Sequence, residues 1–159
     1  MIPVEDKSMV GISALYSDEA SLFLNRFYEA QSSMLHFPSY TASTLFEDTF
    51  FLVGSTSFEQ YPITCFEDAT TFIVLEGMIY NIDETSIRQH LFEIAQKTHA
   101  EIQQKKQISS LLQNADGEFI VIIYNKITKD LCVFNDSQGG SLERMYVIPS
   151  KLFICGRPL

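Results

Sequence analysis

The feature that most constrains the fold is an apolar run from Phe119 to Tyr124, which a second apolar run, Leu131–Asn135, follows after a short polar segment. The first run is much too short to cross a bilayer. Its β-branched and aromatic residues are instead typical of a buried strand. Because the intervening segment Asn125–Asp130 is mostly polar, we predict a β-hairpin.

Other short apolar runs extend the β pattern. The segment MVGISALY at residues 9–16 is typical of a buried strand, and Pro62 breaks the β-like stretch between Thr44 and Leu75. We predict further strands at 50–54, 71–75, 144–148 and 152–155, and a turn at 138–141.

Two segments instead repeat apolar residues at helical spacing. Ser17 is a suitable N-cap for the first, whose apolar residues recur from Phe23 to Met34, and this predicts a helix of about four turns that ends before Pro38. Because these residues keep to one stripe, we expect core packing rather than an exposed partner surface. Asp83 is the expected cap of a second helix, and a short third helix is predicted at 108–113. The apolar stripe of the second helix is Ile87, Leu91, Ile94 and Ala95.

The predicted order is β-α-β-β-α-β-β-β, which is typical of an α+β domain with largely antiparallel sheets and helices packed outside them. The chain has 159 residues, of which 46% are hydrophobic, and this suits one domain with a sizeable core. We assign residues 1–8 to a leader and residues 9–159 to the domain.

The charge and the cysteine content limit the classes of partner and the cellular compartment that we expect for this chain. The net charge is −9, from 20 acidic and 11 basic residues. This argues against nucleic acid, because phosphate binding needs clustered Lys and Arg. The pair Lys105-Lys106 is interpreted as part of a solvated loop. The three cysteines form no Cys-x-x-Cys pair and the three histidines lie far apart. We therefore predict a cytoplasmic chain with no disulfide framework, metal site or membrane segment.

Three segments follow a recognisable order: MVGI at 9–12, EGMIYN at 76–81, and a stretch from Leu111 to Tyr146 that contains GEFIVIIYNKITKDLCVFND. Together they resemble the class II glutamine amidotransferase domain, the N-terminal-nucleophile domain of asparagine synthetase and its relatives. That family shows Met-Cys-Gly-Ile, Asn-Gly-Glu-Ile-Tyr-Asn and a Leu-x-Gly-x-Phe-Ala-Phe hairpin before Arg-Asp-x-x-Gly. The segment LVGSTSF at 52–58 also resembles the family's Leu-Gly-His-x-Arg-Leu. The resemblance implies a four-layer αββα sandwich of antiparallel sheets.

The catalytic residues of that family are missing here. Its nucleophile is a cysteine at the mature N-terminus, and Val10 stands at that place. An isopropyl group has no lone pair with which to attack an amide. The family arginine that binds the glutamine carboxylate falls on Ser57, whose hydroxyl cannot form a bidentate charged pair.

The family's oxyanion hole is altered as well. Its Asn-Gly pair becomes Glu76-Gly77, so the Gly77 N–H is retained in the sequence, but the Glu76 carboxylate would repel a developing oxyanion. The family glutamate after that glycine is Met78, and residues 101–107 lack the acidic pattern that holds the glutamine amine. We therefore predict no catalytic residue and a dismantled pocket. Its degenerate positions are Val10, Ser57, Glu76, Gly77 and Met78.

The resemblance implies a catalytically inactive amidotransferase-like domain that is a scaffold or substrate-binding part of an ATP-dependent, amide-bond-forming enzyme. β-Lactam synthetase and lasso-peptide cyclases, from natural product biosynthesis, keep such a domain. ATP and Mg²⁺ are then expected on a partner synthetase-like domain or chain, and no cofactor on this chain. An incomplete C-terminal side is one alternative, in which a partner or a self-dimer would cover an open sheet edge. A second hypothesis is a free-standing binding or regulatory protein that reuses the old pocket, or a sheet edge, with Glu76 suited to an amine.

A hydrolase that uses Cys65 or Ser8 is the third hypothesis. Carboxylates at 67–68 would raise the pKa of the Cys65 thiol, which favours a structural cysteine, and nothing selects a cleavage point at Ser8. His36 is better explained as a residue at a helix C-terminus than as half of an acid–base pair with residues 47–48. Asp136, in an Asn-Asp-x-x-Gly turn, is either a contact to a neighbouring domain or a turn-forming residue.

Overall fold

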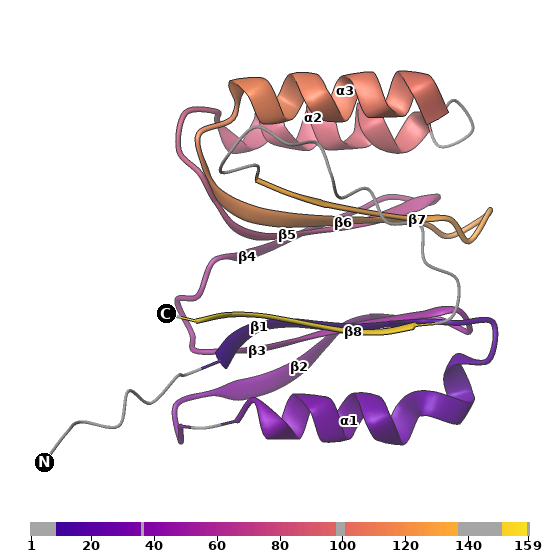
Figure 1. Cartoon of the computed structure of the whole chain (residues 1–159), viewed down its shortest axis with the longest axis vertical. Coiled ribbons are helices and arrows are strands. Elements are labelled where there is room, and N and C mark those ends of the chain that lie inside the picture. Colours follow the sequence, from indigo (N-terminus) through magenta and orange to yellow (C-terminus); the bar gives the residue numbers. More distant parts are fainter. Residues whose placement is uncertain (1–8, 36, 98–100, 137–150, 159) are drawn as a thin grey trace, which may run out of the picture. The chain divides into compact units, whose positions relative to one another are not determined.

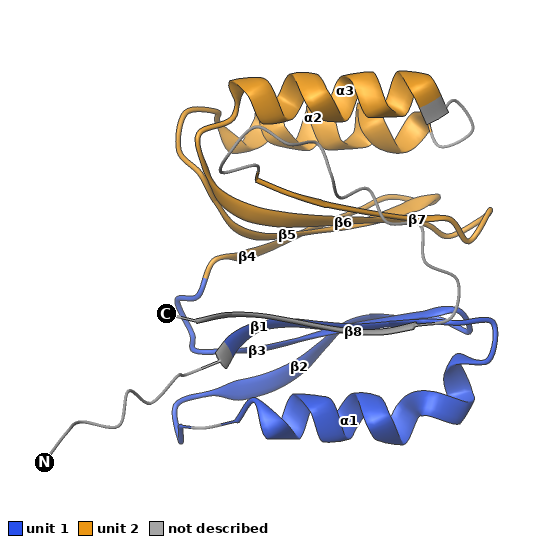
Figure 2. Ribbon diagram, viewed as in Figure 1, with its two compact units in different colours: residues 1–61, 148–159 blue, residues 62–147 orange. Residues whose placement is uncertain are grey.

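The computed structural model describes residues 9–35, 37–97, 101–136 and 151–158, the last stretch by its backbone (Figure 1). The chain divides into two compact units, residues 1–61 with 148–159 and residues 62–147 (Figure 2). Pro62, which we expected to interrupt the β pattern, is the first residue of the second unit. Four predicted features lie outside the described residues: the leader, the turn at 138–141, the strand at 144–148 and His36.

The first unit combines an antiparallel sheet with one helix. Its strands are β1 (Met9–Tyr16), β2 (Thr41–Glu47), β3 (Phe51–Ser57) and β8 (Lys151–Pro158), in the order β2-β3-β1-β8. Between β1 and β2 the 3₁₀ turn η1 (Ala20–Phe23) leads into α1 (Leu24–Ser33), which runs along one face of this sheet (Figure 1).

Helix α1 begins later than the sequence predicts. The Ser17 Oγ accepts a hydrogen bond from the Glu19 N–H at 3.0 Å. The residues that follow form a turn and then the 3₁₀ helix η1, so the α-helix starts only at Leu24, and its N-cap residue Phe23 makes no side-chain cap bond. The predicted end was correct, because α1 ends before Pro38. The predicted core packing is confirmed, since Phe27, Ala30 and Met34 are buried.

Alternate residues of β1 lie on opposite faces of the sheet. Leu15 and its β3 partner Leu52 pack against Phe27 of α1. The other face of β1 is also apolar and buried, and it carries Val10, Ile12 and Ala14.

Among the described strands, β2 is an edge of the first sheet and pairs with β3 alone. Residues Thr41 to Thr44 are all exposed. The strand contains no lysine and no proline, the residues that often protect an edge from pairing with another strand.

The second unit has one antiparallel sheet and two helices. Strands β4 (Ile63–Glu67), β5 (Thr71–Ile79), β6 (Gly117–Asn125) and β7 (Leu131–Asn135) follow one another in space as they do in sequence. Helices α2 (Glu84–Gln96) and α3 (Glu101–Asn114) cover one face (Figure 1). The β6–β7 hairpin confirms the prediction from its apolar runs. None of the helices in the described ranges is long and apolar enough to cross a membrane.

Helix α3 was underestimated from sequence. We predicted a short helix at 108–113, but it starts at Glu101 and includes Lys105 and Lys106, which we had placed in a loop. Its polar first half lacks an apolar stripe. That half is held by a tertiary contact instead, because the buried Gln104 donates from Nε2 to the Ile94 carbonyl of α2 at 3.3 Å.

The core of the second unit lies between its helices and its sheet. The predicted stripe of α2 is confirmed, since all four of its members are buried there. They meet residues from α3 and from three strands, among them Ile108, Leu111, Ile73, Leu75, Phe119 and Phe134.

Truncation of this core should destabilise the chain strongly. Leu91 is fully buried, so Leu91→Ala should lower the free energy of unfolding by about 2–5 kcal/mol, because it removes apolar contacts and leaves a cavity. Ile102 of α3 is 71% exposed, and Ile102→Ala should change that free energy by less than about 0.5 kcal/mol. Urea unfolding followed by circular dichroism measures both. Equal effects would contradict this packing.

Asp83 caps α2 as predicted. Its carboxylate accepts hydrogen bonds from the Ser86 N–H at 2.9 Å and from the Ser86 Oγ at 2.7 Å. The hydroxyl bond first and the backbone bond second hold the pKa of Asp83 below its ordinary value of 3.8. A carboxyl with a lowered pKa stabilises the fold above its unfolded-state pKa, and this stabilisation is lost as the pH falls through the folded-state pKa.

We expect Asp83→Ala to lower the Tm at pH 7, and Asp83→Asn to retain most of the wild-type Tm, because an asparagine oxygen also caps a helix. The Tm difference between wild type and Asp83→Ala should shrink as the pH falls below the ordinary value of 3.8, since the wild-type carboxylate is then protonated. Thermal unfolding across a pH series tests this. A difference that persists undiminished in acid would count against the cap.

Candidate functional site

The first unit brings two of the five predicted pocket residues together. Gly11 of β1 pairs with Thr56 of β3 in antiparallel register, so Val10 and Ser57, one residue further on each strand, lie at the same end of the sheet. Val10 is fully buried and is the second residue of β1. Ser57 is half-buried and is the last residue of β3. The place that the resemblance gives to the nucleophile is therefore occupied by a buried isopropyl group.

The nearest hydroxyl along β1 does not replace that nucleophile. Ser13 is fully buried, and its Oγ donates to the Met34 sulfur at 3.4 Å. Met34 follows α1, so Ser13 lies on the helix-covered face, whereas Val10 lies on the other face because side chains alternate along a strand. In the part of the chain that the structure describes, the Ser13 hydroxyl thus donates to a thioether sulfur, which is not a base.

Strand β5 of the second unit carries the next three positions. Glu76 is fully buried, and its cross-strand partners are Ile63 in β4 and Ile120 in β6. A fully buried carboxyl group therefore stands where the resemblance gives the family an asparagine amide. Met78, where the family has a glutamate, is 50% exposed.

The N–H of Gly77 forms a hydrogen bond within the fold, whereas the resemblance assigns the corresponding N–H of the family to the oxyanion hole. Its N–H donates to the Pro62 carbonyl at 2.8 Å. The donor that the sequence retains is therefore already bound to the chain itself. Gly77 also has a φ of +96°, and a Cβ there would overlap the Glu118 carbonyl oxygen. Only glycine fits this position.

Asp136 closes the end of the β6–β7 pair. Its Oδ1 accepts from the Phe119 N–H and its own N–H donates to the Phe119 carbonyl, both at 3.1 Å. These two bonds extend the β6–β7 pairing by one residue, and the turn in which we placed Asp136 runs into residues 137–140, which lie outside the described residues. Phe119 in turn pairs with Gly77, so Asp136 lies at the same end of the sheet as the altered oxyanion hole.

The cysteines of this unit do not offer a reactive thiol. Cys65 is an exposed residue of β4, yet desolvation of its sulfur first, and the charge of Glu67 second, raise its thiol pKa. Burial raises the pKa of Cys132 to about 12. Asp68, which we expected to act on Cys65, instead accepts backbone N–H groups of Thr70 and Thr71 at 2.8 and 2.7 Å and so caps the β4–β5 turn.

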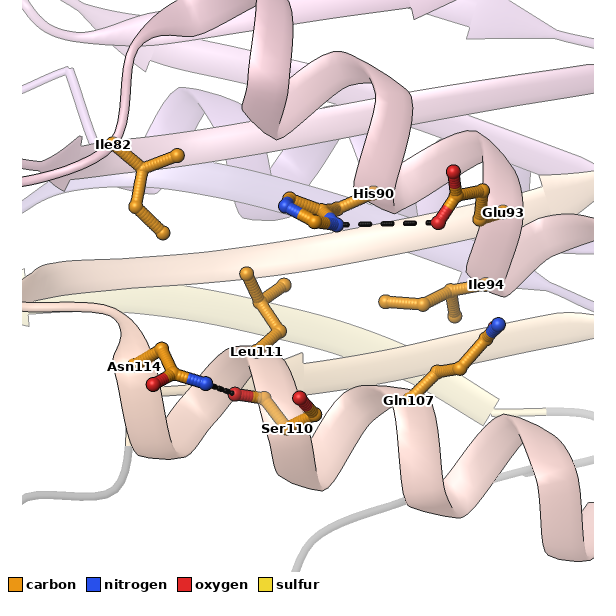
Figure 3. A pocket seen from close by; sticks show the side chains of 8 residues that line it. All are labelled: Ile82, His90, Glu93, Ile94, Gln107, Ser110, Leu111 and Asn114. Atoms are coloured by element: carbon orange, nitrogen blue, oxygen red, sulfur yellow. Dashed lines mark hydrogen bonds and ion pairs between the residues drawn. The ribbon is translucent and has the colours of Figure 1, made fainter.

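The sequence did not predict a groove that lies between α2 and α3 (Figure 3). It has a volume of about 270 Å³. Its one sequence signal was the spacing of His90 and Glu93, which places both on the same side of α2. Across the described ranges, no group of three or more His, Cys, Asp or Glu side chains is arranged to hold a metal ion.

Comparisons with known proteins identify no relative. No protein-family model, curated protein or solved structure matches the chain. Function is therefore inferred from the residues and contacts of the chain itself.

Gly77 is the sharpest test of the site geometry. Gly77→Ala forces a side chain onto a positive φ and against the Glu118 carbonyl, so it should lower the free energy of unfolding by at least about 1–3 kcal/mol. The neighbouring Met78→Ala is the matched control, because half of Met78 is exposed, and its effect should stay within about 0.5 kcal/mol. Chemical denaturation of both variants measures the contrast. A Gly77→Ala protein as stable as wild type would show that β5 has another conformation.

Proposed function

We propose that this chain is a catalytically inactive glutamine amidotransferase-like domain, which is a scaffold or substrate-binding part of an ATP-dependent enzyme that forms amide bonds. The single observation that carries the proposal is the buried Val10 at the opening of β1. A domain with the family's motif order but no nucleophile retains its fold without the reaction. The amine for the new bond would come from the substrate, so no ammonia is needed.

The altered oxyanion hole supports the same proposal independently. Hydrolysis of glutamine requires donors that point to the oxygen on which negative charge develops. Here the Gly77 N–H is directed to the Pro62 carbonyl, and the fully buried Glu76 side chain stands where the family has an asparagine amide. A nucleophile restored at Val10 would therefore still lack electrostatic stabilisation.

The proposal includes the finer fold, an N-terminal-nucleophile αββα sandwich. Its support is that each unit supplies one antiparallel sheet with one helix-covered face, which are the components of such a sandwich. ATP and Mg²⁺ would be bound by a synthetase-like partner domain or chain. The cytoplasm is the compartment we propose, since that chemistry depends on ATP.

Glutaminase activity is the direct test. The wild-type chain should release no ammonia from glutamine above the rate of a protein-free blank. Val10→Cys should also release none, because nine residues precede this position and the Gly77 N–H is already bonded. Coupled detection of ammonia measures both proteins, with Cys65→Ala as the control for the exposed thiol. Ammonia release by the wild type that Cys65→Ala abolishes would overturn the proposal.

The association with a synthetase needs a separate experiment. The native protein should have an intact mass larger than this chain, or should co-purify with a chain that carries a Ser-Gly-Gly-x-Asp pyrophosphate loop. The purified assembly should then exchange pyrophosphate into ATP when its carboxylate substrate is present. A chain that folds stably, has only its own mass and has no such partner would favour the free-standing binding protein instead.

A further inference from the structure

The groove between α2 and α3 joins an apolar base to a polar rim (Figure 3). Ile94 and Leu111 form the base between the two helices, and Ile82, which precedes α2, closes one end. His90 and Glu93 approach from α2, and Gln107, Ser110 and Asn114 approach from α3.

The size of the groove limits its occupant. A volume of about 270 Å³ lies just below the range of about 300–1,000 Å³ that is typical of sites for drug-sized ligands. A nucleotide or a flavin would exceed it, and no Lys or Arg lines it to hold a phosphate. A ligand the size of one long amino-acid side chain fits both the volume of the groove and the absence of Lys and Arg from its lining.

Glu93 determines the charge of the groove. It is the one acidic residue of the lining, and its side chain is 47% exposed. One carboxylate oxygen accepts from the Gln89 Nε2 at 3.0 Å, and the other lies 4.0 Å from the His90 Nδ1. Both oxygens keep free lone pairs, because a carboxylate accepts about four hydrogen bonds.

The remaining polar groups add acceptors. Gln107 Oε1 is buried and accepts no hydrogen bond from the described part of the chain. Rotation of its amide, for which the last side-chain torsion is soft, turns this oxygen toward the groove. Asn114 uses its Nδ2 on the Ser110 carbonyl at 2.7 Å, so its side-chain oxygen is the part left for a ligand.

We propose that this groove binds a primary alkylammonium group. The methylene chain lies over Ile94 and Leu111, and the ammonium donates to the Glu93 carboxylate and to Gln107 Oε1. An ammonium has three donors and no acceptor, which complements a rim that is rich in acceptors and carries one negative charge. This site goes beyond the proposed scaffold function and involves α2 and α3 rather than the strands of the old pocket.

The test is a titration of the whole ¹⁵N-labelled chain, followed by two-dimensional NMR, with n-pentylammonium chloride. Shifts should concentrate in α2 and α3 and saturate. Sodium pentanoate has the same chain with the opposite charge, and it should bind more weakly. Pentanoate binding as tight as that of pentylammonium, or shifts confined to other elements, would overturn the proposal.

Matched variants assign the site to its residues. Glu93→Gln should weaken pentylammonium binding about two- to fivefold, the range for loss of one exposed ion pair. Glu84→Gln, an acid of the same helix outside the groove, should weaken it less. Gln107→Met should weaken binding, whereas Gln103→Met, which is exposed on α3, should not. Equal affinities of Glu93→Gln and Glu84→Gln would exclude the groove as the site.

A blocked Gly-Gly-Lys-Gly-Gly peptide distinguishes two sources of the ammonium. If the peptide binds more tightly than pentylammonium, the natural ligand is a lysine of a protein or peptide. If it binds more weakly, the ligand is a free amine. Either ranking supports the alkylammonium site, and failure of both probes to bind would remove it without affecting the proposed scaffold function.

Discussion

The pairing of β5 with β6 is the interaction on which the second unit depends. Its register brings Gly77 opposite Phe119 and Gly117 opposite Ile79, and the two backbones come so close that a Cβ at either glycine would overlap a carbonyl oxygen of the other strand. This approach fixes the end of the sheet and leaves the Gly77 N–H directed to the Pro62 carbonyl. The same contact therefore organises this end of the sheet and holds Gly77 where its N–H bonds to the Pro62 carbonyl.

Elements with local signals were predictable from sequence. The cap at Asp83 and the apolar stripe of α2 lie within one segment, as does the β6–β7 hairpin, and all three are confirmed. The start of α1 was wrong because a turn and the 3₁₀ helix η1 lie between Ser17 and the α-helix, which begins at Leu24. The first half of α3 was missed because Gln104 is held by α2, a contact that no periodicity reveals. The residue at each predicted pocket position could be identified from sequence. The hydrogen-bond acceptor of the Gly77 N–H could not, because that acceptor is the carbonyl of Pro62, which is distant in sequence.

The proposed scaffold function requires binding rather than catalysis. Two positions of the predicted pocket pack as core, since Val10 and Glu76 are both fully buried. Polar side chains instead line the groove between α2 and α3, where Glu93 and Gln107 border an apolar base. A substrate-binding or docking role is consistent with this distribution, because recognition needs exposed, oriented groups and no strained or activated side chain. The two proposals thus concern different layers of the chain and can be judged separately.

Strand β2 is the feature of the fold that bears on association between separate molecules of this protein. Its exposed run from Thr41 to Thr44 is short, uncharged and unprotected by lysine or proline. An edge of this kind is a template for another strand, and a net charge of −9 makes separate molecules repel one another near neutral pH. Acid that neutralises the carboxylates, or salt that screens them, weakens that repulsion without altering the edge. We therefore expect buffer composition to influence whether the β2 edges of separate molecules pair.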